Sequence, residues 1–368
     1  MKKKLSLLLV LICLLLSACG DGQEAETPSA SAPTPSVSAS ATPSPSPEPT
    51  PTPEPEPEPV NPLTGLPMDE VAAAARPVAV MLNNLAAALP QQGNGDADII
   101  YEVVAEGGIT RMLGVYQDLT DVGTIGSVRS ARPYFVELAL GHDALLVHAG
   151  ASNDGYVAMK DWDADHLDGV NGVYSYPSTG LFWRDRDRVE GKHYAVEHSL
   201  VTTGEAICAV LERSSFRLAH EEDYEPALAF TEDGTPASGE DAGIITVSFS
   251  GVKTGVFRYD ADSGLYQVEQ GSNPYIDGNT GEQIAVTNVL VLRTDITDSG
   301  DSYGHMGVTL SGGEGWFACG GKIVPIAWHK DGPRSPVTYT LEDGSPLLLG
   351  RGKSYVNIVG LSRPVSWE

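Results

Sequence analysis

A proline-rich stretch near the amino terminus separates a part of the chain that cannot fold from a part that can. Residues 20–60 contain no Lys, Arg or aromatic residue, and proline occupies every second position from Pro43 to Pro59. Such a segment has too few apolar side chains to bury a core. Proline at this density favours an extended chain that reaches on the order of 100 Å over 40 residues. We therefore expect a tether here and a folded body that begins at Asn61.

The residues before the tether have the features of a signal peptide. Three lysines, Lys2 to Lys4, precede an unbroken apolar run from Leu7 to Leu16. The run is too short for a membrane-spanning helix, which needs about 20 residues, but it is typical of a signal peptide. It ends in Ser17-Ala18-Cys19, the pattern at which bacterial lipoproteins are cleaved and the cysteine is acylated.

We therefore predict a signal peptide over 1–18, a lipidated Cys19 and a tether over 19–60. The protein would then be extracytoplasmic and lipid-anchored to the cell membrane. A generic signal peptide with an incidental cysteine is the alternative.

Charge and cysteine content exclude two classes of protein. The formal net charge is −26, which argues against a nucleic-acid partner because such binding needs clustered cations. Four cysteines in 368 residues exclude a disulfide scaffold. Cys208 and Cys319 either form one bridge or remain two buried thiols, and the second interpretation is the simpler one.

Residues 61–230 combine apolar runs of strand length, such as 77–82, with helix signals. Pro133 and Gly141 flank an apolar stretch and are typical of a helix start and stop. Thr202 to Glu205 forms a capping box before another apolar face. This pattern predicts an α/β domain.

Residues 243–368 are dominated by strand patterns and tight turns. Gly320-Gly321 and Asp343-Gly344 suit the positive φ angles of two-residue hairpins. The pattern predicts an antiparallel β-rich C-terminal domain. The acidic stretch 219–242 is the expected linker.

A set of motifs in the body is specific when its members are taken together: Asn61–Pro67, Arg76–Met81, Glu106–Arg111, Gly126–Tyr134, His148–Gly150 and Phe182–Asp185. The set resembles the YerB-like lipoprotein family of Gram-positive bacteria, whose two halves are domains of unknown function 3048. The resemblance implies a layered α/β sandwich over 61–230, followed by a β-rich domain. It implies no established activity, substrate or cofactor, and we expect no cofactor. The chain departs from the family pattern around His198, where the histidine is kept but its neighbours differ.

The strongest candidate site lies just before the predicted helix at Pro133. Arg129, Arg132 and the hydroxyls of Ser127 and Ser130 would meet the unpaired N–H groups of a helix N-terminus. Together they would form a clamp for a carboxylate or phosphate. The alternative is structural: a serine caps the helix and the arginines form internal ion pairs. The carboxylates available for such pairs are Glu102, Glu106 and Asp185.

Two further motifs could extend this site. Arg111 completes the Glu106–Arg111 motif. Arg184, Arg186 and Arg188 alternate with aspartates and would share one face of a strand. An exposed, salt-bridged strand or loop is the plainer interpretation of that alternation.

Four residues are candidates for catalysis: His148, Asp185, Glu106 and His198. Ser130, His148 and Asp185 could be arranged as a hydrolase triad, but no Gly-x-Ser-x-Gly elbow supports it. The carboxylates of 161–168 follow a calcium loop only in part, because His166 stands where the loop needs Gly. We therefore assign no metal site.

The expected function is binding by a lipid-anchored protein at the cell surface. The ligand would be an anionic small molecule or wall polymer of the envelope, or a partner protein. The alternative is an enzyme that acts on a cell-wall polymer or a lipid-linked phosphate precursor. Convergence of the arginines without an activated nucleophile would favour binding.

The Ser17-Ala18-Cys19 pattern generates the first testable prediction. Replacing Cys19 with Ala should release the protein from the membrane fraction or leave an unprocessed precursor, because the acylated side chain is lost. Fractionation and immunoblotting measure this. Firm membrane retention of a cleaved Cys19→Ala protein would contradict the prediction.

Overall fold

The computed structural model describes residues 58–190, 195–222 and 224–368. The predicted signal peptide, Cys19 and all but the last residues of the tether lie outside the described residues. The described residues belong to one unit that extends to Glu368.

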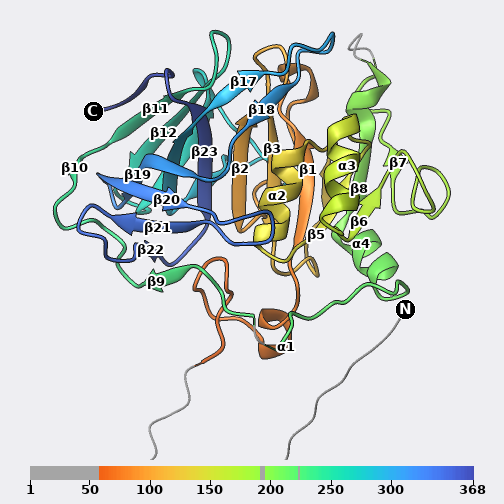
Figure 1. The fold of residues 1–368 in the computed structure, drawn as a ribbon, viewed down its shortest axis with the longest axis horizontal. Coiled ribbons are helices and arrows are strands. Elements are labelled where there is room, and N and C mark those ends of the chain that lie inside the picture. The colour runs from red at the N-terminus through yellow and green to blue at the C-terminus, as the bar shows by residue number, and fades with distance from the viewer. Residues whose placement is uncertain (1–57, 191–194, 223) are drawn as a thin grey trace, which may run out of the picture. The chain divides into compact units, whose positions relative to one another are not determined.

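A mixed sheet of 11 strands forms the centre of this unit (Figure 1). Its strands are Val78–Asn83 (β1), Ile99–Val104 (β2), Thr110–Tyr116 (β3), Leu145–His148 (β5), His166–Asp168 (β6), Glu240–Asp241 (β10), Asn288–Thr294 (β16), Gly312–Cys319 (β19), Lys322–His329 (β20), Thr338–Leu341 (β21) and Ser354–Gly360 (β23). Their order across the sheet is β10-β20-β19-β16-β23-β2-β3-β1-β5-β6, and β21 pairs with β20.

A second sheet of six strands comes entirely from the C-terminal half. It contains Ile244–Ser248 (β11), Thr254–Asp260 (β12), Leu265–Gln270 (β13), Asn273–Pro274 (β14), Ala285–Val286 (β15) and Val365–Trp367 (β24). Three small sheets combine Thr124–Gly126 (β4) with Trp183–Arg184 (β7) and Leu200–Thr203 (β8), Ala229–Thr231 (β9) with Leu348–Gly350 (β22), and Ile296–Asp298 (β17) with Met306–Val308 (β18).

Helices are few and short in the part of the chain that the structure describes. They are Glu70–Ala73 (α1), Pro133–Gly141 (α2), Asn153–Asp161 (α3) and Gly204–Leu211 (α4), with the 3-10 helices Ala86–Ala88 (η1) and Val196–Ser199 (η2). Pro133 is the first residue of α2, as predicted. The Thr203 side chain caps α4 by accepting from Ala206 N, one residue later than the capping-box pattern places it.

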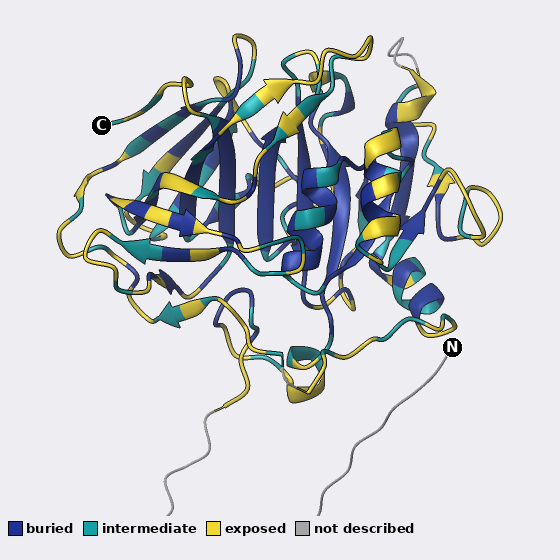
Figure 2. Cartoon of the chain, viewed as in Figure 1, coloured by how far each residue is buried: buried dark blue, intermediate teal, exposed yellow. Residues whose placement is uncertain are grey.

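The central sheet is apolar on both faces, which explains why its strands are continuous apolar runs. All six residues of β1 are buried, and Figure 2 shows the same for its neighbours. Val80 and Leu82 belong to a core cluster that includes the second sheet, whereas Ala79 and Met81 belong to a cluster that includes α2. Alternate side chains of a strand point to opposite faces, so the helix α2 and the second sheet cover different faces.

The chain is mostly strand with few helices, in mixed and antiparallel sheets. The pairing differs from the purely antiparallel C-terminal half that the sequence predicts. β23 runs parallel to both β16 and β2, so the C-terminal strands continue the sheet of the N-terminal half. The expected linker 219–242 contributes β9 and β10. A sequence pattern marks a strand, but it does not record which distant strand will be its partner.

Two other expectations concern cysteines and membrane crossing. Cys208 and Cys319 are both free thiols, and Cys319 is buried. Within the described ranges, no helix has the length and apolar character needed to cross a bilayer.

A chain that ends at residue 230 should not fold cooperatively. It retains β2 but loses β23, which pairs with Ile99 to Val103 along one edge of β2. Unpaired backbone along β2 and the apolar face that the second sheet covers would then meet water. Urea titration followed by tryptophan fluorescence should show no sigmoidal transition. Residues 231–368 supplied as a second chain should restore the transition, and a cooperative transition in the truncated chain alone would contradict this prediction.

Candidate anion-binding site

The predicted site residues gather at one edge of the central sheet. β1 is antiparallel to β3, and β3 is antiparallel to β2, so β1 and β2 run in the same direction, and β5 is parallel to β1. The carboxyl ends of these three strands therefore share an edge, which is where open α/β sheets bind ligands. The segment 127–132 crosses this edge: Arg129 N donates to Met81 O at 3.0 Å, and α2 then begins.

A glycine turn between β2 and β3 presents a carboxylate at this edge. Gly107 and Gly108 have φ angles of 57° and 82°, a left-handed conformation that favours glycine. The turn closes with Ala105 N donating to Ile109 O at 2.9 Å. The Glu106 side chain then lies between two arginines. Arg132 Nη2 is 2.9 Å from Glu106 Oε2, and Arg111 Nη2 pairs with Glu106 Oε1.

Arg111, Arg129 and Arg132 form what we call the arginine cluster. The side chains of Arg111 and Arg132 are only 5% and 6% exposed, whereas that of Arg129 is 16% exposed. Arg129 Nη2 lies 3.6 Å from the carboxylate of Glu197, which is itself largely exposed. The buried Nε atoms of Arg129 and Arg132 have no hydrogen-bond partner among the described residues.

The cluster carries more positive charge than its buried surroundings neutralise. Burial lowers the pKa of Arg111 to about 9, and the nearby charge of Arg132 lowers it further while Glu106 opposes the change. Burial also lowers the pKa of Arg129, against the influence of Glu197. The charged forms of Arg111 and Arg129 are thus disfavoured by burial and by a like charge, so a bound anion would stabilise both.

The hydroxyl groups expected to complete the clamp have other partners. Ser130 Oγ donates to Ala149 O at 2.9 Å. Ser127 is fully buried, and its Oγ accepts from Asn83 Nδ2 at 3.3 Å. The structure therefore brings the arginines together without the two serines, which hold the backbone of this edge instead.

Arg184 lies beside the arginine cluster, but Arg186 and Arg188 do not lie on the same face as Arg184. Its Nη1 donates to Val196 O at 2.7 Å, next to the Glu197 that meets Arg129. Arg186 is exposed, and Arg188 turns inward. The strand β7 ends at Arg184, so the alternating motif continues as a turn and the predicted common face of three arginines does not form.

His148 is fully buried, and both of its ring nitrogens are engaged. The Gly150 carbonyl can only accept, so His148 Nδ1 donates to it at 2.8 Å. In the neutral ring Nε2 is then the acceptor, and His166 Nδ1 lies 2.9 Å away as its donor. Burial lowers the pKa of His148 to about 4, against the influence of Asp168. This histidine supports the loop after β5 and has no nitrogen left to activate a nucleophile.

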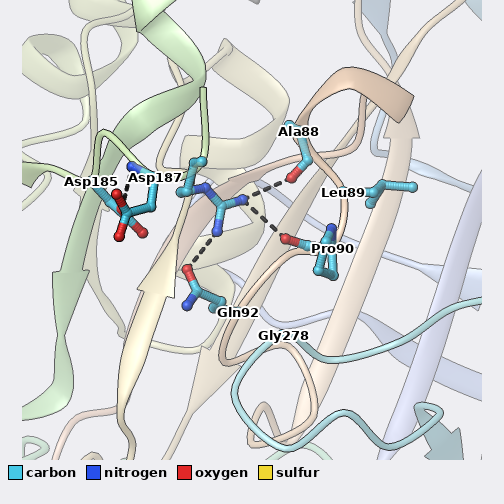
Figure 3. Close-up of a pocket in the computed structure, with 8 residues that line it drawn as sticks. Ala88, Leu89, Pro90, Gln92, Asp185, Asp187 and Gly278 are labelled. Atoms are coloured by element: carbon cyan, nitrogen blue, oxygen red, sulfur yellow. Dashed lines mark hydrogen bonds between the residues drawn. The ribbon is translucent and has the colours of Figure 1, made fainter. Parts of the chain in front are cut away.

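Asp185 lies in a separate cavity of about 210 Å³ (Figure 3). Its Oδ1 accepts from Asp187 N at 3.1 Å. Arg188 also lines this cavity, and its guanidinium binds Gln92 and the carbonyl oxygens of Ala88 and Pro90. The hypothetical triad is therefore wrong: Ser130, His148 and Asp185 have different partners, because the turn after β7 carries Asp185 to the loop 88–92.

His198 is buried beside the end of β1. Its Nδ1 is 2.9 Å from Asn83 Nδ2, and the same amide reaches Ser127. Burial lowers the pKa of His198, and the charge of Arg129 lowers it further. The histidine thus joins η2 to β1.

Two residues at this edge, Asn83 and Asp168, were not predicted from the sequence as site residues. Asn83 organises Ser127 and His198, and Asp168 accepts from the backbone N–H of both Gly150 and Val170 at 2.8 Å. Asn83 could have been found, since it is the first polar residue after an apolar strand. Asp168 gave no usable signal, because it belongs to a run of acidic residues. Over the described ranges, no group of three or more His, Cys, Asp or Glu is placed to hold a metal ion.

Two cavities adjoin the turn between β2 and β3, and both are lined by Gly108. Neither is lined by a residue of the arginine cluster. The cluster thus presents one partly exposed guanidinium, that of Arg129, at this edge.

The fold and this edge define a mixed α/β protein with clustered arginines at the carboxyl ends of its strands. Residues 63–217 match a family model described as "Protein of unknown function (DUF3048) N-terminal domain", and residues 245–356 match the C-terminal domain of the same family. The chain is 32% identical over 301 residues to "Putative lipoprotein YerB" of Bacillus subtilis (strain 168), an alignment that spans 81% of this chain and 85% of that protein.

A solved structure gives the same result. The crystal structure of the YerB protein from Bacillus subtilis matches with a TM-score of 0.70 and 28% identity, over 83% of this chain and 99% of that one. The chain therefore belongs to the YerB-like family of proteins of unknown function, and the resemblance found in the sequence motifs is confirmed.

Acidification should destabilise the protein through its buried histidines. The pKa of His148 is about 4 when folded and near 6.5 when unfolded, so the unfolded chain binds more protons between these values. The stabilisation is present above pH 6.5 and is lost as the pH falls toward 4. Lowering the pH from 7 to 5 should cost about 2 kcal/mol for this group alone.

Urea unfolding of wild type and His148→Gln at pH 7 and pH 5 measures this effect. The variant should lose less stability on acidification than wild type, although His142 has a similarly lowered pKa and contributes its own share. The exposed His329→Gln is the matched control and should behave as wild type. Equal pH dependence in His148→Gln and wild type would show that His148 is not the group involved.

Proposed function

We propose that this protein is a lipid-anchored, extracytoplasmic binding protein. Its arginine cluster would hold a phosphate or carboxylate group of an envelope molecule. The single observation that carries the proposal is the gathering of three guanidinium groups at this edge, two of them on one internal carboxylate, in a chain of net charge −26.

Arg129 is the residue we assign to direct contact with the anion. It is the least buried member of the cluster, and its Nε has no partner among the described residues. Its long ion pair with the exposed Glu197 resembles a surface pair, which contributes at most about 1 kcal/mol. A ligand oxyanion could therefore displace Glu197 at little cost and gain a charge-assisted hydrogen bond.

Arg111 and Arg132 have a supporting role in this proposal. Both are held by Glu106, and Arg132 also donates to Ala131 O at 2.8 Å. Two cations on one carboxylate leave a positive field at the start of α2. The N-terminus of that helix adds its own partial positive charge.

The position of the cluster suits a tethered protein. The described chain starts at Glu58, and Asn61 Nδ2 donates to Asp98, the residue before β2. This is the amino edge of the sheet, whereas the arginine cluster lies at the carboxyl edge. The first residues of the body and the arginine cluster therefore lie at opposite edges of the sheet. The lipoprotein name of the Bacillus subtilis relative supports the predicted anchor at Cys19.

Calorimetric titration of the full-length protein with pyrophosphate and with citrate tests the proposal. Arg129→Gln should weaken binding of the preferred anion about 10- to 100-fold, the loss expected for one charge-assisted hydrogen bond. Arg129→Lys should also bind more weakly, because an ammonium group does not reproduce the planar fork of arginine. The two probes separate a phosphate site from a carboxylate site.

The matched control is Arg213→Gln, which removes the same charge from an exposed position just after α4. It should bind as wild type. Equal losses in both variants would indicate a general charge effect, and unchanged binding by Arg129→Gln would reject this residue as the anion contact.

A further inference from the structure

A cavity on the other face of the sheet has a polar wall of its own. Its volume is about 380 Å³, within the range of about 300–1,000 Å³ typical of small-molecule sites. It lies between the end of β1, the turn before β3, and the strands β12 to β14. It shares no lining residue with the arginine cluster, so it is a separate feature of the molecule.

A fully buried carboxylate fixes the polar wall of this cavity. Glu102 is 0% exposed, and its Oε1 accepts from Asn84 Nδ2 at 2.8 Å and from Thr110 Oγ1 at 2.6 Å. Its Oε2 accepts from the Tyr355 hydroxyl and, at 3.4 Å, from Gln270 Nε2. Four neutral donors therefore surround the carboxylate and hold it in one orientation.

This arrangement determines how two amide side chains are turned. Asn84 and Gln270 both line the cavity, and both direct their NH₂ groups at Glu102. Their carbonyl oxygens are buried and have no hydrogen-bond partner in the described part of the chain. An unpaired buried carbonyl oxygen is costly, so a ligand that brings an N–H to this wall would be favoured.

Lys253 supplies the charge of the cavity. Among the described residues that line the cavity, it is the only charged one. Its Nζ donates to Asn84 O at 3.2 Å and lies 4.0 Å from Glu102 Oε1, whose lone pairs are taken by closer donors. An ammonium group has three N–H donors, so Lys253 retains donors for a ligand. Burial lowers the pKa of Lys253, and an added anion would oppose that effect.

The rest of the described lining includes the polar Thr254 and Asn273 and no aromatic ring. Leu85, Leu89, Ile109 and Val252 give this wall aliphatic side chains. A ligand that fits these walls has one carboxylate, an N–H group close to it, and a small branched hydrocarbon. We propose that the cavity binds an N-acylated aliphatic amino acid, with its carboxylate on Lys253 and its amide N–H toward the carbonyl oxygen of Asn84 or Gln270.

Three related probes test this ligand class by calorimetric titration of the full-length protein. N-acetyl-L-leucine carries all three features, N-acetyl-L-leucinamide lacks the charge, and 4-methylpentanoate lacks the amide. N-acetyl-L-leucine should bind most tightly, about 10- to 100-fold more tightly than the uncharged amide. Lys253→Gln should abolish this preference for the acid. Equal binding of acid and amide by wild type would overturn the assignment to a carboxylate, and equal binding of 4-methylpentanoate would overturn the role of the N–H.

A cavity-filling variant avoids any disturbance of the buried Glu102 network. Ala86 lies on η1 and lines the cavity, whereas its neighbour Ala87 does not. Ala86→Trp should lose binding of N-acetyl-L-leucine, and Ala87→Trp should retain it. Unchanged binding by Ala86→Trp, or no saturable binding of any probe by wild type, would overturn the proposal.

Discussion

The parallel pairing of β23 on both of its edges is the interaction on which the rest of the structure depends. This strand hydrogen-bonds to β2 on one side and to β16 on the other. It thereby joins strands from two halves of the chain that are more than 150 residues apart in sequence into one sheet. Its side chains alternate between the two core clusters, with Tyr355 facing the second sheet and Val356 facing the side of α2. Both core clusters therefore include side chains of β23. Neither face of the sheet can be covered fully unless β23 pairs with β2 and β16.

The alternation of side chains along a strand also separates two charged sites that are adjacent in sequence. Thr110 and Arg111 are consecutive in β3, so their side chains point to opposite faces of the sheet. Thr110 meets the buried Glu102 on the face of the second sheet, and Arg111 meets Glu106 at the start of α2. Each site has its own internal carboxylate, and each carboxylate is held by donors from elements far apart in the chain. Low exposure makes the ion pairs of Glu106 costly to break, because removing one partner leaves a buried charge without compensation.

The sequence predicted where two residues of the arginine cluster lie but not which carboxylate the cluster contacts. The motif before Pro133 correctly placed Arg129 and Arg132 at a helix start, because proline in the first turn and an apolar stretch after it are local signals. Nothing local indicated that Glu106 would lie between Arg111 and Arg132. That contact depends on the turn at Gly107 and Gly108, and on the approach of a helix from a different part of the chain. Ser130, His148 and Asp185 were compatible with a triad in the sequence, yet in the structure each side chain has a different partner.

What the sequence alone determined was local or compositional: strands where apolar residues run together, the helix at Pro133, tight turns at paired glycines, and the motifs that mark the YerB-like family. These features depend on backbone preferences and burial within a few residues, so a short window of sequence contains them. The tertiary structure alone decided the partners of β23, the convergence of the arginine cluster, and the cavity at Lys253. Each of these results from the sum of many contacts between distant residues. No single residue determines that sum. A pattern that predicts a strand therefore does not predict which strand pairs with it.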